Sequence, residues 1–149
     1  MIHISVQHAA IDIATEMARA ETAGAGAVAT FTGLVRADDG VGTLELEHYP
    51  GATEAALHRV AEGAIERWDL SAALIVHRIG AMQPGERIVF VAAAAPHRGA
   101  ALEACAYLID RLKTDAPFWK RETRGVEAHW VEARHGDDVA ATRWDAEPA

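Results

Sequence analysis

Two lysines, Lys113 and Lys120, have the clearest capacity for proton-transfer chemistry in this chain. They are the only lysines in 149 residues, against twelve arginines, and both fall within residues 112–122 (LKTDAPFWKRE). The pKa of a lysine falls readily when its ammonium is desolvated or crowded by cations, whereas arginine stays protonated in proteins. A lysine can therefore act as base, acid or nucleophile where arginine cannot. The alternative is that two surface lysines lie near each other by chance.

A second candidate group, His97 and Arg98, lies at a predicted turn from a strand into a helix (residues 96–99, PHRG). The exposed backbone N–H groups at a helix start favour anions. Arg98 adds a fork of hydrogen-bond donors, and His97 adds a titratable ring. The pair therefore predicts a phosphate or carboxylate site; the alternative is that both side chains only cap the turn.

The distribution of charge also favours a local anion site. Residues 97–124 hold six Arg or Lys and four Asp or Glu, a local charge of +2, whereas the rest of the chain carries −10. A basic island on an acidic protein suits a phosphate or carboxylate. Arg36 and Arg134 each end a predicted strand and are further candidates for this site. The overall net charge of −8 argues against general nucleic-acid binding.

The two lysines fall in different predicted elements. Lys113 falls at the C-terminal end of a helix, where the helix dipole alone would account for a cation. Lys120 falls on the next strand, where alternation places Phe118, Lys120 and Glu122 on one face. The Glu122 carboxylate then either forms a solvated ion pair with Lys120 or holds it in place as a base.

Apolar periodicity predicts an α+β fold with helices packed on a mainly antiparallel sheet. The strand at 87–95 is apolar on both faces, which is typical of a central strand. Residues 83–86 (QPGE) predict a hairpin turn before it, and residues 38–40 (DDG) predict another turn. The predicted strands are 2–7, 27–35, 43–49, 73–79, 87–95, 118–122 and 127–134, and the helices are 11–22, 57–68 and 98–113. We expect one domain over 1–149, with a frayed tail at about 146–149.

Other chemistries are less favoured. The single cysteine, Cys105, falls in the apolar stripe of its helix and is expected in the core. No histidine shows metal-ligand spacing, and neither a phosphate-binding glycine loop nor a nucleophile elbow is present. We expect no metal and no cofactor. The chain has no apolar run long enough to span a membrane and no signal-peptide pattern at its start, so we expect a cytoplasmic protein.

From about residue 26 to 134, the sequence resembles the catalytic (large) subunit of molybdopterin synthase. The most specific stretch is 112–122, which carries both lysines. One departure is Leu34, where the family often has lysine. The other matching stretches are 31–36 (FTGLVR), 46–51 (LEHYPG), 76–80 (VHRIG), 83–86 (QPGE), 95–98 (APHR) and 130–134 (WVEAR).

This resemblance implies an α/β-hammerhead fold and a sulfurtransferase reaction. Sulfur from the C-terminal Gly-Gly thiocarboxylate of a small ubiquitin-like subunit would convert cyclic pyranopterin monophosphate to molybdopterin, in molybdenum cofactor biosynthesis. A homodimer would bind two small subunits as a heterotetramer. The implied roles are catalysis by Lys113 and Lys120, substrate binding by Arg36, His97, Arg98 and Arg134, and a tunnel for the partner's tail lined by Phe31, Phe118 and Glu122.

Two other functions remain open from the residues alone. A lysine could form a Schiff base with a phosphorylated carbonyl substrate, in which case borohydride would trap the adduct on Lys113. Alternatively, the basic island could belong to a non-catalytic module that binds anions or the C-terminal tail of another protein. Such a module would bind a Gly-Gly tail without forming product.

Overall fold

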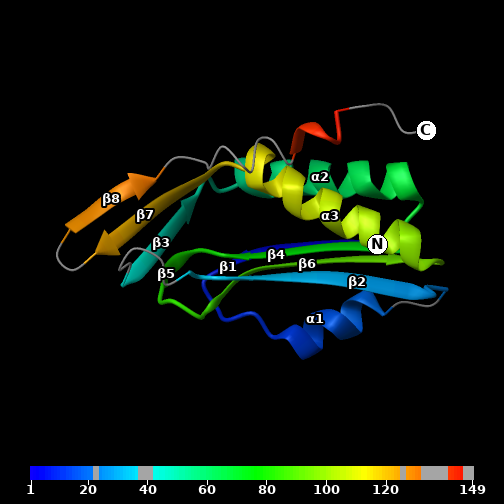
Figure 1. Cartoon of the computed structure of the whole chain (residues 1–149), viewed down its shortest axis with the longest axis horizontal. Coiled ribbons are helices and arrows are strands. Elements are labelled where there is room, and N and C mark those ends of the chain that lie inside the picture. The colour runs from blue at the N-terminus through cyan, green and yellow to red at the C-terminus, as the bar shows by residue number, and fades with distance from the viewer. Residues whose placement is uncertain (22–23, 37–41, 125–126, 132–140, 146–149) are drawn as a thin grey trace.

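The computed structural model describes residues 1–21, 24–36, 42–124, 127–131 and 141–145, and side chains over all of these except 124 and 127–131. It has two four-stranded sheets and three helices of at least eight residues within those ranges (Figure 1). The α+β prediction is confirmed, but the sheet is divided in two. No helix among the described residues is long and apolar enough to cross a membrane.

The first sheet, here sheet A, has the strand order β1–β4–β6–β2. The β1–β4 pair is parallel, and the other two pairs are antiparallel. β6 is central and buried along nearly its whole length, as its two apolar faces predict. The bounds of these strands are β1 (Ile2–Gln7), β4 (Ala72–Arg78), β6 (Arg87–Ala95) and β2 (Ala27–Leu34).

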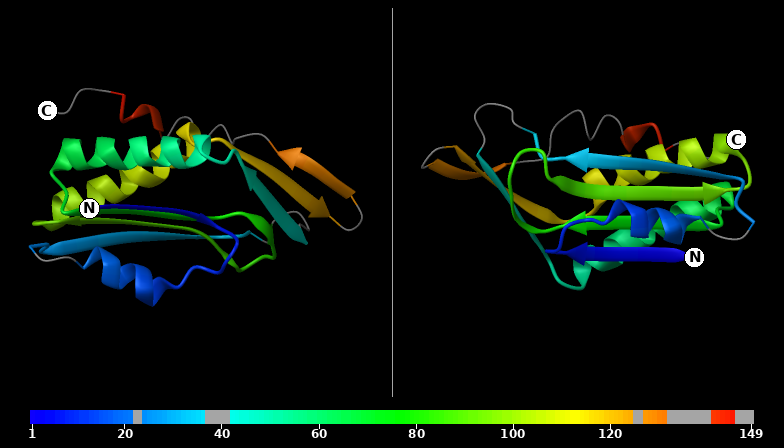
Figure 2. Two further views of the ribbon diagram at one scale, coloured as in Figure 1. Left: turned by 180° about the vertical axis from the view of Figure 1, so that it is seen from behind. Right: turned by 90° about the horizontal axis from the view of Figure 1, so that it is seen from below.

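Helices cover both faces of sheet A (Figure 2). On one face, α2 (Ala52–Trp68) packs against β1 and β4, and α3 (Arg98–Asp115) packs against β2 and β6. On the other face, α1 (Ile13–Ala20) packs against β4 and β6. Because both faces are covered, alternate side chains of β4 and β6 enter two separate hydrophobic clusters.

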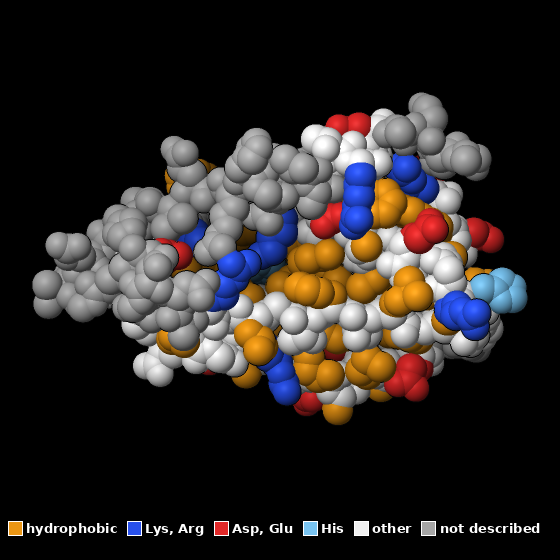
Figure 3. Space-filling model, in the orientation of Figure 1, with side chains coloured by type: hydrophobic (Ala, Val, Ile, Leu, Met, Phe, Trp, Pro, Cys, Tyr) orange, Lys and Arg blue, Asp and Glu red, His pale blue; other side chains and the backbone are white. Residues whose placement is uncertain are grey.

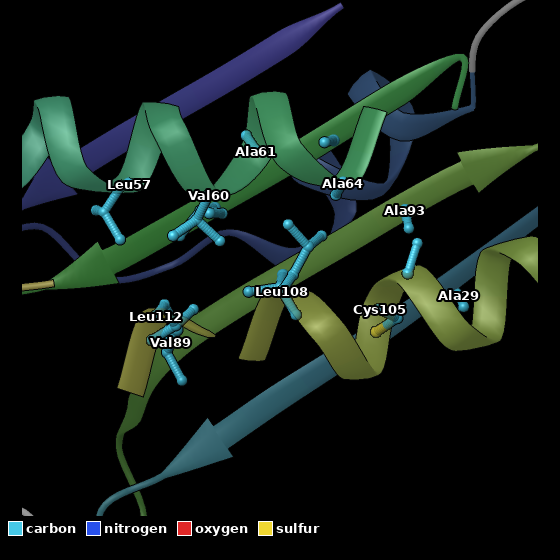
Figure 4. Packing of buried hydrophobic residues seen from close by; sticks show 14 of the residues in the cluster. Ala29, Leu57, Val60, Ala61, Ala64, Val89, Ala93, Cys105, Leu108 and Leu112 are labelled. Carbon is cyan, nitrogen blue, oxygen red and sulfur yellow. The ribbon is translucent and has the colours of Figure 1, made fainter. Parts of the chain in front are cut away.

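The larger cluster fixes the height of α3 above the sheet. α3 buries the small residues Ala101, Ala104 and Cys105 in its first half and Leu108 and Leu112 in its second half. Leu108 and Leu112 belong to the same buried cluster as Leu57 of α2 and Val89 of β6 (Figure 4). This apolar stripe at helical spacing holds the C-terminal end of α3 over the ends of β4 and β2.

The second sheet, here sheet B, extends beyond one end of sheet A and has the order β5–β3–β7–β8 (Figure 1). All its pairs are antiparallel. The short strand β5 was not predicted; it occupies the connection between β4 and β6, ahead of the 83–86 turn, and pairs with β3. The bounds are β5 (Gly80–Met82), β3 (Thr43–His48), β7 (Phe118–Arg124) and β8 (Glu127–Val131).

α3 connects the two sheets and runs from the end of β6 to the start of β7. It ends at Asp115, and Ala116 is already extended, because Pro117 cannot continue a helix. Its N-terminal end therefore lies at one end of sheet A, and its C-terminal end lies where sheet B begins (Figure 1). The predicted turn at 38–40 and the predicted frayed tail at 146–149 lie outside the described residues.

Candidate active site

The two lysines lie together at the junction of α3 with sheet B. Lys113 is in the last turn of α3, and Lys120 is in the third position of β7. Both ammonium groups are close enough to the ring of His77, near the end of β4, for their charges to lower its pKa. Three elements from different parts of the chain therefore meet at this point. Lys113 lies at the C-terminal end of α3, and Lys120, His77 and Phe118 lie around it. We call these four residues the lysine end of α3.

His77 is a buried, neutral histidine. Its side chain faces α2 and α3, and the residue is 3% exposed. Its Nδ1 lies 2.8 Å from the carbonyl oxygen of Arg78. Burial and then the charges of Lys113 and Lys120 lower the pKa of His77 to about 3, against the hydrogen bond to Arg78, which raises it. The ring is therefore uncharged at neutral pH.

β7 presents the face that the alternation predicted. Phe118, Lys120 and Glu122 are half-buried, whereas the residues between them, Trp119 and Arg121, are exposed. The Phe118 ring stacks on the His77 ring, with centroids 4.1 Å apart and planes at 24°. Phe118, Lys120 and Glu122 thus face the molecule's interior at the lysine end.

Strand register places Arg36 and Phe31 toward the same end of sheet A. His77 is paired with Val89, and Val89 with Gly33, so these residues form a row across β4, β6 and β2. Phe31 precedes this row by two residues on the same face and is 40% exposed. Arg36 follows the end of β2 and is exposed.

Gly33 is required for the packing of this row. A Cβ atom there would lie 2.7 Å from Cγ1 of Val89 and 3.4 Å from the Phe31 ring. The first distance is shorter than side chains tolerate, so a larger residue would displace Val89 or the strand. The glycine therefore lets β2 lie close to β6 beside Phe31.

His97 and Arg98 lie at the opposite end of α3. His97 is the N-cap residue and Arg98 is the first residue of the helix. At a rise of about 1.5 Å per residue, the fifteen positions from Arg98 to Lys113 span roughly 22 Å. Within one chain, the structure thus does not bring His97 and Arg98 to the lysines.

The first residues of α3 are exposed to solvent. His97 and Arg98 are both exposed, and His97 makes no side-chain cap hydrogen bond. The alternative that these side chains only cap the turn is therefore not supported for His97. We call His97 and Arg98 the arginine end of α3. Figure 3 shows positive side chains in several separate places on one face of the molecule.

Arg134 and Cys105 are the two remaining residues that the sequence singled out. Arg134 lies outside the described residues, so its role stays a prediction. Cys105 is buried in the core as expected, and burial raises the pKa of its thiol to about 11. A thiol held in its neutral form is a poor nucleophile. Among the described residues, no cluster of His, Cys, Asp or Glu is arranged to hold a metal ion.

His77 was missed as a site residue by sequence reasoning. It follows the apolar run 72–76 (AALIV), so its local pattern is that of a core histidine. The signal that identifies it is tertiary: the ring lies under Phe118 and near two lysines distant in sequence.

Comparison of the sequence with known proteins identifies a family. A family model described as MoaE protein matches residues 6–115. The molybdopterin synthase catalytic subunit of Pseudomonas aeruginosa is 50% identical over 147 residues, which cover 95% of this chain and 98% of that protein.

Solved structures agree in fold. A molybdopterin biosynthesis MoaE protein from Burkholderia ambifaria superposes with a TM-score of 0.85 at 46% identity, covering 99% of this chain and 100% of that chain. The molybdopterin synthase structure from Staphylococcus aureus gives a TM-score of 0.80 at 32% identity, covering 87% of this chain and 96% of that one. The chain therefore belongs to the MoaE family of molybdopterin synthase catalytic subunits, which are enzymes of molybdenum cofactor biosynthesis.

Proposed function

We propose that this chain transfers sulfur from the C-terminal thiocarboxylate of a small ubiquitin-like subunit to cyclic pyranopterin monophosphate, forming the dithiolene of molybdopterin. The observation that carries this proposal is the meeting of two lysines beside a neutral histidine in a chain without a reactive thiol. Family membership is consistent with this reaction.

The sulfur must come from outside the chain. Sulfur transfer commonly uses a cysteine thiolate, but the single cysteine here is in the core with a raised pKa. A thiocarboxylate on a partner protein supplies the sulfur nucleophile instead. The partner's tail is anionic, and a site with two lysines suits an incoming anion.

Lys113 and Lys120 are the proposed catalytic residues. Each replacement of a C–O bond by a C–S bond requires protons to be moved and negative charge to be stabilised. Two ammonium groups, one from α3 and one from β7, can do both, because either one can release a proton while the other keeps its charge. The neutral His77 adds no positive charge beside them.

The remaining site residues have proposed roles in binding. Arg36 and Arg134 would hold the phosphate of the pterin substrate, since guanidinium groups bind phosphate with paired hydrogen bonds. Phe31, Phe118 and Glu122 would line the path of the partner's C-terminal tail. Phe31 is exposed on the edge strand, and Phe118 is at the entry to β7.

His97 and Arg98 would act on the substrate held by a second copy of the chain. The roughly 22 Å between the two ends of α3 is too long for both ends to contact one small substrate in one protomer. In a twofold dimer, the same patch contacts itself, so the arginine end of one α3 can face the lysine end of the other. Apolar side chains are exposed across the middle of the face in Figure 3, which suits such a contact.

The proposed assembly is therefore a homodimer with one small sulfur-carrier subunit at each end, a heterotetramer. The proposed location is the cytoplasm.

The test is formation of molybdopterin from purified precursor and thiocarboxylated partner. The unaltered chain should give product, and Lys113→Ala or Lys120→Ala should give little. Lack of product with the unaltered chain would reject the sulfurtransferase proposal. Borohydride trapping of precursor on Lys113 in the absence of the partner would instead support a Schiff-base enzyme.

A further inference from the structure

The start of β7 rests on a side chain of the other sheet. β4 belongs to sheet A and β7 to sheet B, and the His77 and Phe118 rings join them by stacking. A stacked aromatic pair stabilises a contact beyond the burial of its area. Phe118 is the first residue of β7, so this contact fixes the strand where it begins.

The His77 ring is itself held in one orientation. A carbonyl oxygen only accepts hydrogen bonds, so the 2.8 Å contact with Arg78 places the proton on Nδ1 and leaves the lone pair on Nε2. The backbone of His77 is paired with Val6 of β1 on one side and Val89 of β6 on the other. A ring fixed in this way provides a rigid surface for Phe118.

Lys120 depends on this surface through two residues of strand. Phe118 and Lys120 lie on the same face of β7, about 6.6 Å apart along an extended chain. Their partners on β3 are His48 and Leu46, so the register of this segment is defined. A shift of Phe118 would therefore be passed on to the ammonium of Lys120.

We propose that His77 is a positioning residue for the sulfur-transfer site: its ring holds Phe118 and thereby sets the place of Lys120 relative to Lys113. This inference rests on the proposed function, because it assigns His77 to the same site. A displacement of about 1 Å in a catalytic group can lower a rate by as much as 10²-fold.

Neutrality explains why a histidine can occupy this position. A charged ring would be a buried cation beside two ammonium groups, which is unfavourable. Burial and the two lysines keep the pKa of His77 at about 3, so the ring remains uncharged at neutral pH. The ring therefore supplies a flat surface without altering the charge of the site.

A second contact holds the neighbouring residue. The hydroxyl of Thr53, which is fully buried in α2, donates to the carbonyl oxygen of Pro117 at 2.8 Å. The same oxygen of Thr53 accepts from the backbone N–H of Tyr49 at 2.9 Å. The backbone before β7 is thus fixed by Thr53, and the first side chain of β7 is fixed by His77.

The test compares His77→Leu, which removes the flat ring, with His77→Phe, which keeps one. Steady-state formation of molybdopterin is measured with purified precursor and thiocarboxylated partner. We expect His77→Leu to lower kcat by about 10-fold or more with KM for precursor within about twofold, and His77→Phe to recover kcat to within about threefold of the parent.

Val76→Ala is the matched control. Val76 precedes His77 on β4 but is buried in the cluster on the opposite face, beside α1. This variant should lower the midpoint of thermal unfolding and keep its kcat. It separates loss of stability in β4 from loss of the ring surface.

Two results would overturn the inference: a parental kcat in His77→Leu, or an equal loss in both His77 variants. If His77→Leu does not fold, NMR of the unaltered chain decides. The ring protons of His77 should be shifted upfield by Phe118 and the proton should be on Nδ1, and unshifted signals or the other tautomer would reject the stack. The NMR result tests the stack of His77 on Phe118 and does not depend on activity. A failure of the proposed reaction would instead be seen as lack of product with the unaltered chain.

Discussion

The two ends of α3 carry similar residue types in opposite settings. At the lysine end, Lys113 lies beside a buried imidazole, a stacked phenyl ring and a strand from the second sheet. At the arginine end, His97 and Arg98 are exposed, and His97 makes no side-chain hydrogen bond to the helix. The side chains of the lysine end are thus packed against other elements of the same chain. His97 and Arg98 are exposed to solvent within one protomer.

This difference suggests separate roles in catalysis and in substrate binding for the two ends. Catalytic groups must be held to within a fraction of an ångström, so they are expected where several elements converge. A guanidinium that binds phosphate tolerates more freedom until its ligand and neighbours arrive. We therefore assign the chemistry to the lysine end and the completion of the substrate site to the arginine end of a second copy.

The largest expected effect is the loss of Lys113. Lys113→Ala should lower kcat by about 10²–10³-fold, because the charge that stabilises the anionic intermediates is removed. Lys113→Arg keeps the charge but cannot release a proton, so recovered activity would assign a purely electrostatic role. Arg59→Ala, which removes an exposed cation from α2, is the control. A parental rate in Lys113→Ala would contradict the contrast between the two ends.

The next effect concerns the response of stability to acid. The pKa of His77 is about 3 in the folded state and 6.5 when unfolded, so the unfolded state binds this proton first as the pH falls. The contribution is complete above pH 6.5 and is lost as the pH falls toward 3. Between pH 7 and 4.5, the parent should lose about 2–3 kcal/mol more than His77→Phe.

Urea denaturation of both proteins at the two pH values measures this difference. Other titrating groups act nearly equally in the two proteins and cancel in the comparison. Equal losses in parent and His77→Phe would mean that the imidazole is not held neutral in the folded protein.

A smaller effect is expected from the backbone contact before β7. Thr53→Val keeps the shape of the side chain but removes the bond to Pro117 and leaves the N–H of Tyr49 without its acceptor. The expected loss is about 1–3 kcal/mol in the free energy of unfolding, measured by chemical denaturation. Thr30→Val, on the exposed side of edge strand β2, should be nearly neutral. Equal stabilities of the two variants would show that Thr53 does not hold β7.

Much of the fold could be predicted from local pattern because most elements have clear periodicity. The two-faced apolar run of β6 predicted its central place, and the alternation in β7 predicted the face of Lys120. β5 is only three residues long and follows β4 after one residue, so it has too few positions to show a period of two. The division into two sheets depends on the pairing of β5 and β7 with β3, which is a long-range property.

The site was predictable where residue type itself limits the chemistry. The chain has two lysines against twelve arginines, so composition alone draws attention to the lysines. His77 could not be identified in this way, because its role depends on a ring 41 positions later in the chain. The separation of Arg98 from Lys113 is set by the length of α3, which sequence pattern predicts, but the second copy proposed to close it is not encoded in any local pattern.

The smallest effect should be that of Arg98 on stability. Arg98 is exposed at the first position of α3, so Arg98→Ala should change the free energy of unfolding by no more than about 0.5 kcal/mol. Thermal denaturation of the isolated chain tests this expectation. A loss of several kcal/mol would mean that the arginine end is organised within the protomer.

The most direct test mixes the Lys113→Ala and Arg98→Ala variants of the proposed homodimer, each expected to be inactive alone, under conditions of subunit exchange. In a mixed dimer, one site carries both substitutions, and the other has an intact lysine end and an intact arginine end. Random exchange should therefore restore about a quarter of the parental rate of molybdopterin formation. Activity that stays at the sum of the two separate variants after exchange is demonstrated would contradict a site shared between the two ends of α3.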